Sequence, residues 1–278
     1  MNTPLPSIFV SHGSPMIALE PREAGRFMQR LGADIVERWG RPRAVIVASA
    51  HSLTREPVLL AAPRHEAVYD FGGFDVRLGS LRYDAPGAPE LARRVQALLQ
   101  AAGIAAHVSE EGGLDHGIWT AMRYLFPEAD IPLLPLAWPP DWSPERLFAL
   151  GDALAPLAGQ GVLVIGSGSI THNLRRVFAG GRTPAADQPV TPESLAFRDW
   201  FARTTAAGDW PALFDYRRQA PYAELMHPTD EHLLPWFVAA GAGGSAVPGR
   251  RIHASFTHGD LGMDAYAFGS AAAELAAA

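Results

Sequence analysis

Short apolar runs alternate with amphipathic segments along the chain, and this alternation limits the possible folds more than any other feature. We expect a strand at Ile8–Val10 and a second at Ala44–Ala50, whose unbroken apolar run is typical of a strand buried on both faces. Between them, residues 21–39 carry apolar side chains at helical spacing. Strand, helix and strand in this order form a βαβ unit, which implies parallel strands joined by a right-handed crossover.

The same pattern recurs further along the chain. Strands are expected at Pro57–Ala62, Ile104–Val108, Ile131–Leu136 and Val162–Ile165, and helices at Pro89–Ala102, at Pro144–Leu157 and after a Thr191 cap. The C-terminal part predicts an edge strand at Arg251–Phe256 and an alanine-rich helix from about Asp264. No internal repeat or linker of disordered composition interrupts the pattern. We therefore predict a single α/β domain over residues 1–278, with a central, mostly parallel sheet flanked by helices.

Composition excludes several functional classes. The 278 residues include 23 basic and 29 acidic side chains, and a net charge of −6 argues against a nucleic-acid partner. With no cysteine, disulfides, thiolate–zinc sites, iron–sulfur clusters and thiol nucleophiles are excluded, so any metal needs nitrogen and oxygen ligands. Prolines and glycines interrupt the long uncharged stretch 233–249, which argues against a membrane span. No basic residue precedes Arg22, so we expect no secretory signal and a cytoplasmic location.

Three of the ten histidines directly follow predicted strands. His12 follows Ile8–Val10, His51 follows Ala44–Ala50, and His172 comes shortly after the strand at Val162–Ile165. Ligands of open parallel sheets bind beyond the carboxyl ends of the strands. A lone histidine in such a place is usually structural, but three in the same topological position predict a shared site.

Two more histidines precede predicted helix starts. His116 lies in a glycine-flanked loop before a helix expected near Ile118, and His227 precedes Pro228, where we expect another helix. His232 is five residues after His227, an offset of about 140° on a helix, so the two should not share a metal. We expect surface or local structural roles for the remaining histidines, which are His65, His107, His253 and His258.

Taken together, these segments give the sequence a specific resemblance. It resembles the class III extradiol ring-cleavage dioxygenases, in the branch that includes DOPA 4,5-dioxygenase. The matching segments, in the order that the family shows, are Ser11–Pro15, Ser49–His51, Tyr69–Phe74, Leu114–Gly117, Gly166–Ser169 with Thr171–Leu174, and His227–His232. The sequence departs from the family pattern at two places, both of which concern the wall of the substrate pocket. Ser52 stands where an aromatic residue often follows the Ser49–His51 segment, and Gly72 and Gly73 fall together in the Tyr69–Phe74 segment, which usually contains a second aromatic residue.

The resemblance implies roles for individual residues. His12, His51 and His227 would bind the metal, with His172 as a possible fourth ligand or, with His116, as the catalytic acid/base pair. The candidates for substrate binding are Ser14, Tyr69, Asp115 and Trp119, the last of which could form the wall of an aromatic pocket.

The resemblance also implies a reaction. The partners would be a small aromatic diol such as L-DOPA and O2, and the product a muconic semialdehyde. The cofactor would be one divalent ion, Fe²⁺ or Zn²⁺, with Fe²⁺ required for dioxygenase activity. A metal-ligating carboxylate could come from Asp70, Asp115 or Asp230. Two alternatives remain open: a zinc-dependent hydrolase and a non-catalytic metal- or ligand-binding member of the superfamily. The sequence does not determine the oligomeric state.

Overall fold

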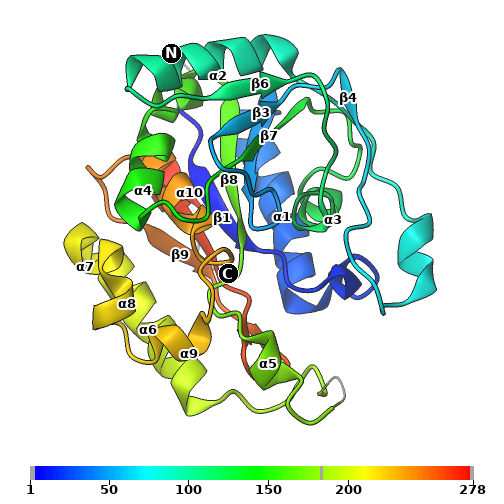
Figure 1. Cartoon of the computed structure of the whole chain (residues 1–278), viewed down its shortest axis with the longest axis vertical. Coiled ribbons are helices and arrows are strands. Elements are labelled where there is room, and N and C mark those ends of the chain that lie inside the picture. The colour runs from blue at the N-terminus through cyan, green and yellow to red at the C-terminus, as the bar shows by residue number, and fades with distance from the viewer. Residues whose placement is uncertain (1–3, 182–183, 276–278) are drawn as a thin grey trace.

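An eight-stranded sheet runs through the centre of the molecule (Figure 1), in the order β6-β3-β7-β2-β8-β1-β12-β9. This computed structural model describes residues 4–181 and 184–275. The strands of the sheet are β1 (Ser7–Ser11), β2 (Ala44–Ser49), β3 (Val58–Leu60), β6 (His107–Ser109), β7 (Leu133–Ala137), β8 (Val162–Gly168), β9 (Arg250–His253) and β12 (Ala265–Phe268). The central strands β7, β2, β8 and β1 are parallel neighbours, whereas β12 pairs antiparallel with β1 and β9, and β3 with β7.

Helices cover both faces of this sheet. One face packs against α1 (Arg22–Trp39) and α3 (His116–Leu125), and the other against α2 (Pro89–Ala101), α4 (Pro144–Asp152), α6 (Pro192–Ala207) and α10 (Pro235–Gly243). The shorter elements are α5 (Leu174–Val177), α7 (Trp210–Phe214), α8 (Tyr216–Gln219), α9 (Ala223–Met226), the two small sheets β4 (Arg64–His65) with β5 (Ala85–Pro86) and β10 (Phe256–Thr257) with β11 (Leu261–Gly262), and the 3₁₀ helices η1 (Pro15–Ala18), η2 (Val76–Ser80), η3 (Ala155–Gln160) and η4 (Ser270–Glu274). The predicted α/β fold with a mostly parallel, helix-flanked sheet is confirmed.

The core follows from the alternation of side chains along the strands. On β1, Ile8 and Val10 point to the face covered by α1 and α3, whereas Phe9 points to the other face. The predicted Thr191 cap of α6 is confirmed, since its side chain accepts a hydrogen bond from the Ser194 N–H. In the described part of the chain, no helix is long and apolar enough to cross a membrane.

Two predicted helices are absent. The alanine-rich segment after Asp264 forms strand β12, because pairing with β1 buries Tyr266 and Phe268 in the core. Three further alanines lie in the short 3₁₀ helix η4, and residues 276–278 lie outside the described part of the chain. Residues 228–234 form bends and turns between α9 and α10, so the helix expected at Pro228 does not form.

Candidate active site

The predicted convergence of strand ends is visible at the carboxyl edge of β2, β8 and β1. The His12 N–H donates to the Gly168 carbonyl at 3.0 Å and the Ala50 N–H to the Ser167 carbonyl at 3.0 Å, so the three strands end side by side. The Nε2 atoms of His12 and His51 lie 3.1 Å apart. Two histidines 39 residues apart in sequence therefore face each other.

Hydrogen bonding fixes which nitrogen of His12 carries a proton. Ser167 Oγ lies 2.6 Å from the Gly117 carbonyl oxygen and 3.0 Å from His12 Nδ1. The hydroxyl has one proton, which it donates to the carbonyl, so it accepts a hydrogen bond from Nδ1–H. The lone pair of neutral His12 is therefore on Nε2, the atom that faces His51.

His116 joins this group from the first turn of α3. Its ring centroid is 3.9 Å from that of His51. Its Nδ1 lies 3.0 Å from Asp70 Oδ1, so the carboxylate engages Nδ1 and leaves Nε2 available. The next residue must be glycine, because a Cβ at Gly117 would lie 2.6 Å from Ser49 Oγ and 3.0 Å from His12 Cε1. This close packing brings the start of α3 against the strand ends.

Asp115 ties the segments of His51 and His116 together. Its buried carboxylate accepts hydrogen bonds from Ser49 Oγ at 2.7 Å and Ser52 Oγ at 2.6 Å, and it caps α3 through the Ile118 N–H. Burial raises the pKa of Asp115, although both hydroxyls act in the opposite direction. Ser52 thus supports this buried carboxylate.

His172 and His232 form the second half of the site. Their rings stack with centroids 3.4 Å apart and planes 10° from parallel, and the His232 ring lies 4.9 Å from His51 and 5.6 Å from His12. His232 therefore lies with the clustered histidines, which the helical spacing assumed for residues 227–232 did not predict, because residues 228–234 form bends and turns. The pairing of His232 Nδ1 with Glu231 Oε1 at 3.1 Å leaves its Nε2 available.

His227, which the resemblance implies as a metal ligand, lies against a backbone carbonyl. Its fully buried Nε2 lies 2.8 Å from the Ile170 carbonyl oxygen, and its ring packs against Phe197 of α6. Within the described residues, His227 belongs to neither group whose donor atoms could hold one metal ion; these groups are His12–His51–His116 and His172–Glu231–His232.

None of the three carboxylates considered from the sequence belongs to either group in the described chain. Asp70 bonds to His116 and Asp115 to two serines, while Asp230 bonds to Tyr216 and Arg217.

The electrostatics of the site favour neutral imidazoles. Burial, together with the neighbouring imidazoles, holds the pKa of His12 and of His232 well below the usual value. Burial is also the main cause that lowers the pKa of His51 to about 4 and that of His172 to about 3. Neutral imidazole is the form that binds a divalent cation.

The donor geometry also fits such an ion. Metal–nitrogen distances of about 2.0–2.1 Å with tetrahedral angles put two nitrogens about 3.3 Å apart, close to the observed 3.1 Å between His12 and His51.

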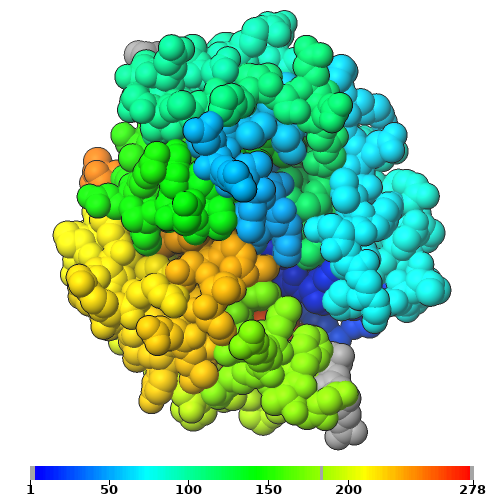
Figure 2. Space-filling model, viewed as in Figure 1, coloured from blue at the N-terminus to red at the C-terminus, as the bar shows by residue number. Residues whose placement is uncertain are grey.

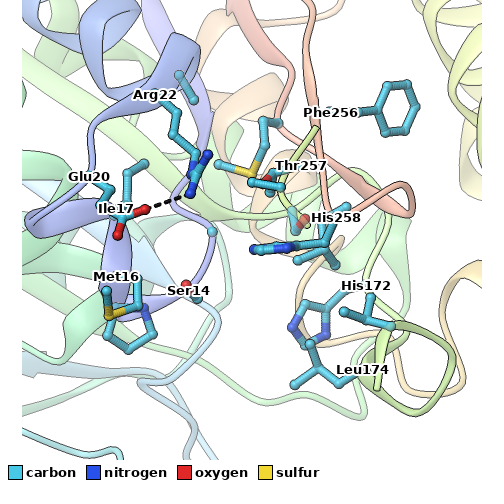
Figure 3. Close-up of a pocket in the computed structure, with 18 of the residues that line it drawn as sticks. Ser14, Met16, Ile17, Glu20, Arg22, His172, Leu174, Phe256, Thr257 and His258 are labelled. Carbon is cyan, nitrogen blue, oxygen red and sulfur yellow. Dashed lines mark hydrogen bonds and ion pairs between the residues drawn. The ribbon is translucent and has the colours of Figure 1, made fainter. Parts of the chain in front are cut away.

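A cavity of about 970 Å³ opens onto the histidines. Figure 2 shows the blue N-terminal segment between the cyan segment and the light-green segment that carries α5. In Figure 3, Ser14 and Met16 lie on one side of the cavity and His172 on the other, with the His258 ring pointing into the space between. His258 was expected to have a surface or local role, and its Nδ1 does bond to the Pro184 carbonyl at 2.9 Å, yet it lines this cavity.

One of the four predicted substrate-binding residues, Ser14, is among the residues that line the cavity. Asp115 and Trp119 are buried behind the lining, and Tyr69 is an exposed residue outside it. Phe71 forms the wall in their place, with its ring edge-on to His116 at 5.6 Å and 6.4 Å from the buried Trp119. A signal for Phe71 is present in the Tyr69–Phe74 segment, but spacing alone does not show which of its aromatic rings faces the cavity.

Comparison with known proteins agrees with this geometry. Residues 6–269 match the family described as the catalytic LigB subunit of aromatic ring-opening dioxygenase. The chain is 36% identical to a 4,5-DOPA dioxygenase extradiol from Beta vulgaris, covering 95% of this chain and 96% of that protein. It is 33% identical to a protein of the same name from Escherichia coli K12, covering 87% and 86%.

A solved structure shows the same fold. The crystal structure of an uncharacterized protein from Escherichia coli K12 superposes with a TM-score of 0.75 at 28% identity, covering 95% of this chain and all of that one. The family match spans nearly the whole chain and includes each of the clustered histidines. The chain therefore belongs to the LigB family of extradiol aromatic ring-opening dioxygenases.

Proposed function

We propose that this enzyme opens the ring of a catechol such as L-DOPA next to the diol with O2, to give a muconic semialdehyde. The observation that supports this most strongly is the cluster of five histidines beside a largely apolar cavity, with Nε2 of His12 and of His51 3.1 Å apart. Four of the five line the cavity: His51, His116, His172 and His232. The relatives named 4,5-DOPA dioxygenase extradiol support an L-DOPA-like substrate.

One divalent ion would bind to Nε2 of His12 and of His51. A third nitrogen could come from His116, which forms a group of possible ligands with these two, or from His232, whose ring lies 4.9 Å from that of His51; we assign it to His232. Both His116 and His232 have Nε2 available, but His116 packs edge-on against Phe71, on the wall where an aromatic ring would lie. His232 instead contacts His51 and the stacked His172. When bound, ferrous iron would supply Lewis acidity toward the diol and a path for electrons from the catecholate to O2.

The other two histidines would then move protons. His116 presents Nε2 to the substrate while the Asp70 carboxylate holds Nδ1 and stabilises the imidazolium formed when a catechol hydroxyl gives up its proton. His172 lines the cavity beside His232 and acts as the second acid/base group. The apolar wall that includes Phe71 holds the ring and excludes water from it.

Anaerobic reconstitution tests the activity. The apoprotein is loaded with Fe²⁺ or with Zn²⁺ and mixed with L-DOPA and a panel of other catechols, and oxygen is then admitted. We expect a yellow product and consumption of one O2 per catechol with Fe²⁺ only. The absence of product and of oxygen consumption across the panel would refute the proposal.

Single alanine variants test the assignment of the third ligand. His232→Ala should lose the metal, whereas His116→Ala should keep it bound at one ion per chain and lose ring cleavage. The opposite result, with metal lost in His116→Ala and kept in His232→Ala, would exchange the two roles. His107→Ala is the matched control. His107 is an exposed histidine on the edge strand β6, where it pairs with Glu56, so its loss should change neither metal binding nor ring cleavage.

A further inference from the structure

The buried ring of His227 connects the two chain segments that carry His172 and His232. Its Nε2 lies 2.8 Å from the Ile170 carbonyl oxygen, two residues before His172. A carbonyl oxygen can only accept, so the ring donates from Nε2–H. The ring is fully buried and packs against Phe197, with centroids 5.5 Å apart.

Backbone and amide groups complete this connection. The Ser169 N–H donates to the His232 carbonyl at 2.8 Å, and the His172 N–H to the Met226 carbonyl at 3.0 Å. The Asn173 side-chain amide donates to the Leu225 carbonyl at 2.6 Å. Together with the bond from His227, these contacts join residues 169–173 to residues 225–232.

Neither segment is held by regular secondary structure where it carries its histidine. Residues 169–173 follow the end of β8, and residues 227–234 form bends and turns. The rings of His172 and His232 nevertheless stack 3.4 Å apart and 10° from parallel. Such an arrangement requires the two backbones to keep a fixed separation, and the hydrogen bonds between the segments set that separation.

His227 is itself fixed at nearly every polar atom. Its N–H donates to the Ala223 carbonyl at 2.8 Å, and its carbonyl accepts from Arg217 Nη1 at 3.0 Å. The ring nitrogen Nδ1 is buried without a hydrogen-bond partner among the described residues. The ring is therefore committed to the Ile170 carbonyl and has no freedom to turn Nε2 toward the other histidines.

We propose that His227 is a positioning residue, whose Nε2–H bond to Ile170 sets the spacing of His172 and His232, and that it does not bind the metal. This inference rests on the proposed function for the roles of those two rings. If this is so, another side chain that donates a hydrogen bond from the position of Nε2 can replace His227. If His227 were a metal ligand, such a side chain could not replace it.

Two amide variants of the full-length protein separate these roles. In His227→Gln, the amide nitrogen reaches approximately the position of Nε2, whereas in His227→Asn it reaches only that of Nδ1. We expect His227→Gln to keep the wild-type metal affinity and a kcat within about threefold, and His227→Asn to lose about 10- to 100-fold in metal affinity or kcat, as is typical when the partner that orients a ligand is lost. His232→Gln is the comparison, because it removes a proposed ligand directly.

The measurement is competition for Fe²⁺ or Zn²⁺ against a chelator, combined with steady-state kinetics on L-DOPA. Equal loss of metal in His227→Gln and His232→Gln would overturn the proposal and make His227 a ligand. Wild-type behaviour of His227→Asn would also overturn it. Metal competition needs no turnover, so a failure of the ring-cleavage assay would refute the proposed function and leave this test intact. Should His227→Asn not fold, which thermal unfolding shows, His227→Gln alone decides the outcome.

Discussion

Replacing Ser167 with alanine should weaken metal binding without touching a ligand. Ser167 is fully buried near the end of β8, where its hydroxyl donates to the Gly117 carbonyl and accepts from His12 Nδ1–H. This second bond places the lone pair of His12 on Nε2, 3.1 Å from Nε2 of His51. Ser167→Ala removes the hydrogen bond that holds this tautomer and helps to orient the ring.

The size of the effect follows from the groups that lose a partner. A buried N–H left without an acceptor costs about 1–3 kcal/mol, and loss of a group that orients a metal-bound histidine typically lowers metal affinity about 10- to 100-fold. Since tenfold corresponds to about 1.4 kcal/mol, the two ranges agree. We therefore expect the dissociation constant for Fe²⁺ or Zn²⁺ to rise about 10- to 100-fold in Ser167→Ala.

Chelator competition on the apoprotein measures this constant, and Ser7→Ala provides a matched control. Ser7 is a buried serine on β1, the strand that ends just before His12, and its Oγ donates to the Ala239 carbonyl at 2.6 Å. Ser7→Ala thus loses a buried hydrogen bond of similar kind but should bind metal as the wild type does. If Ser167→Ala and Ser7→Ala bound metal within twofold of each other, the tautomer argument would be refuted.

Three further predictions concern packing, pH and substrate. Gly241→Ala should destabilise the fold by about 3 kcal/mol, because a Cβ there would lie 1.9 Å from the Phe148 carbonyl oxygen; calorimetry checks this, with Gly159→Ala, which meets open space, as control. Burial raises the pKa of Asp264 to about 6. The stability that its protonation in the native state contributes is therefore complete below about pH 4 and is lost as pH rises through about 6. The free energy of urea unfolding, measured across this range, should depend less on pH in Asp264→Asn than in the wild type. Phe71→Ala should raise KM for the catechol about tenfold, the effect of losing roughly 1.4 kcal/mol of apolar contact, with a smaller change in kcat.

The sequence predicted the central part of the fold well because local pattern and burial agree there. The run Ala44–Ala50 is apolar at almost every position, and the resulting strand β2 is buried along its whole length between β7 and β8. The residues after Asp264 show the opposite case. Alanine favours helix locally. Hydrogen bonding to β1 and the burial of Tyr266 and Phe268 in the core outweigh that preference. Partners distant in sequence decide such a segment, and a local pattern does not contain them.

The site was predictable to the same extent and for the same reason. His12 and His51 could be located from sequence because each follows a parallel strand, and neighbouring parallel strands end at one edge. His227 and His232 could not be ranked in this way, since their segment lies between elements and its conformation is set by contacts with residues 169–173.

The angle between two side chains five residues apart is defined only when the secondary structure is known. On a helix, His227 and His232 would point about 140° apart, so only one of the two could belong to the site. In the turns that form instead, the His232 ring reaches His172 while His227 Nε2 reaches the Ile170 carbonyl. Both rings face the same strand end from one short segment, and what distinguishes them is the atom that each meets there. Nε2–H of His227 donates a hydrogen bond to the Ile170 carbonyl oxygen. Glu231 bonds only to Nδ1 of His232, so Nε2 of His232 is available to a metal.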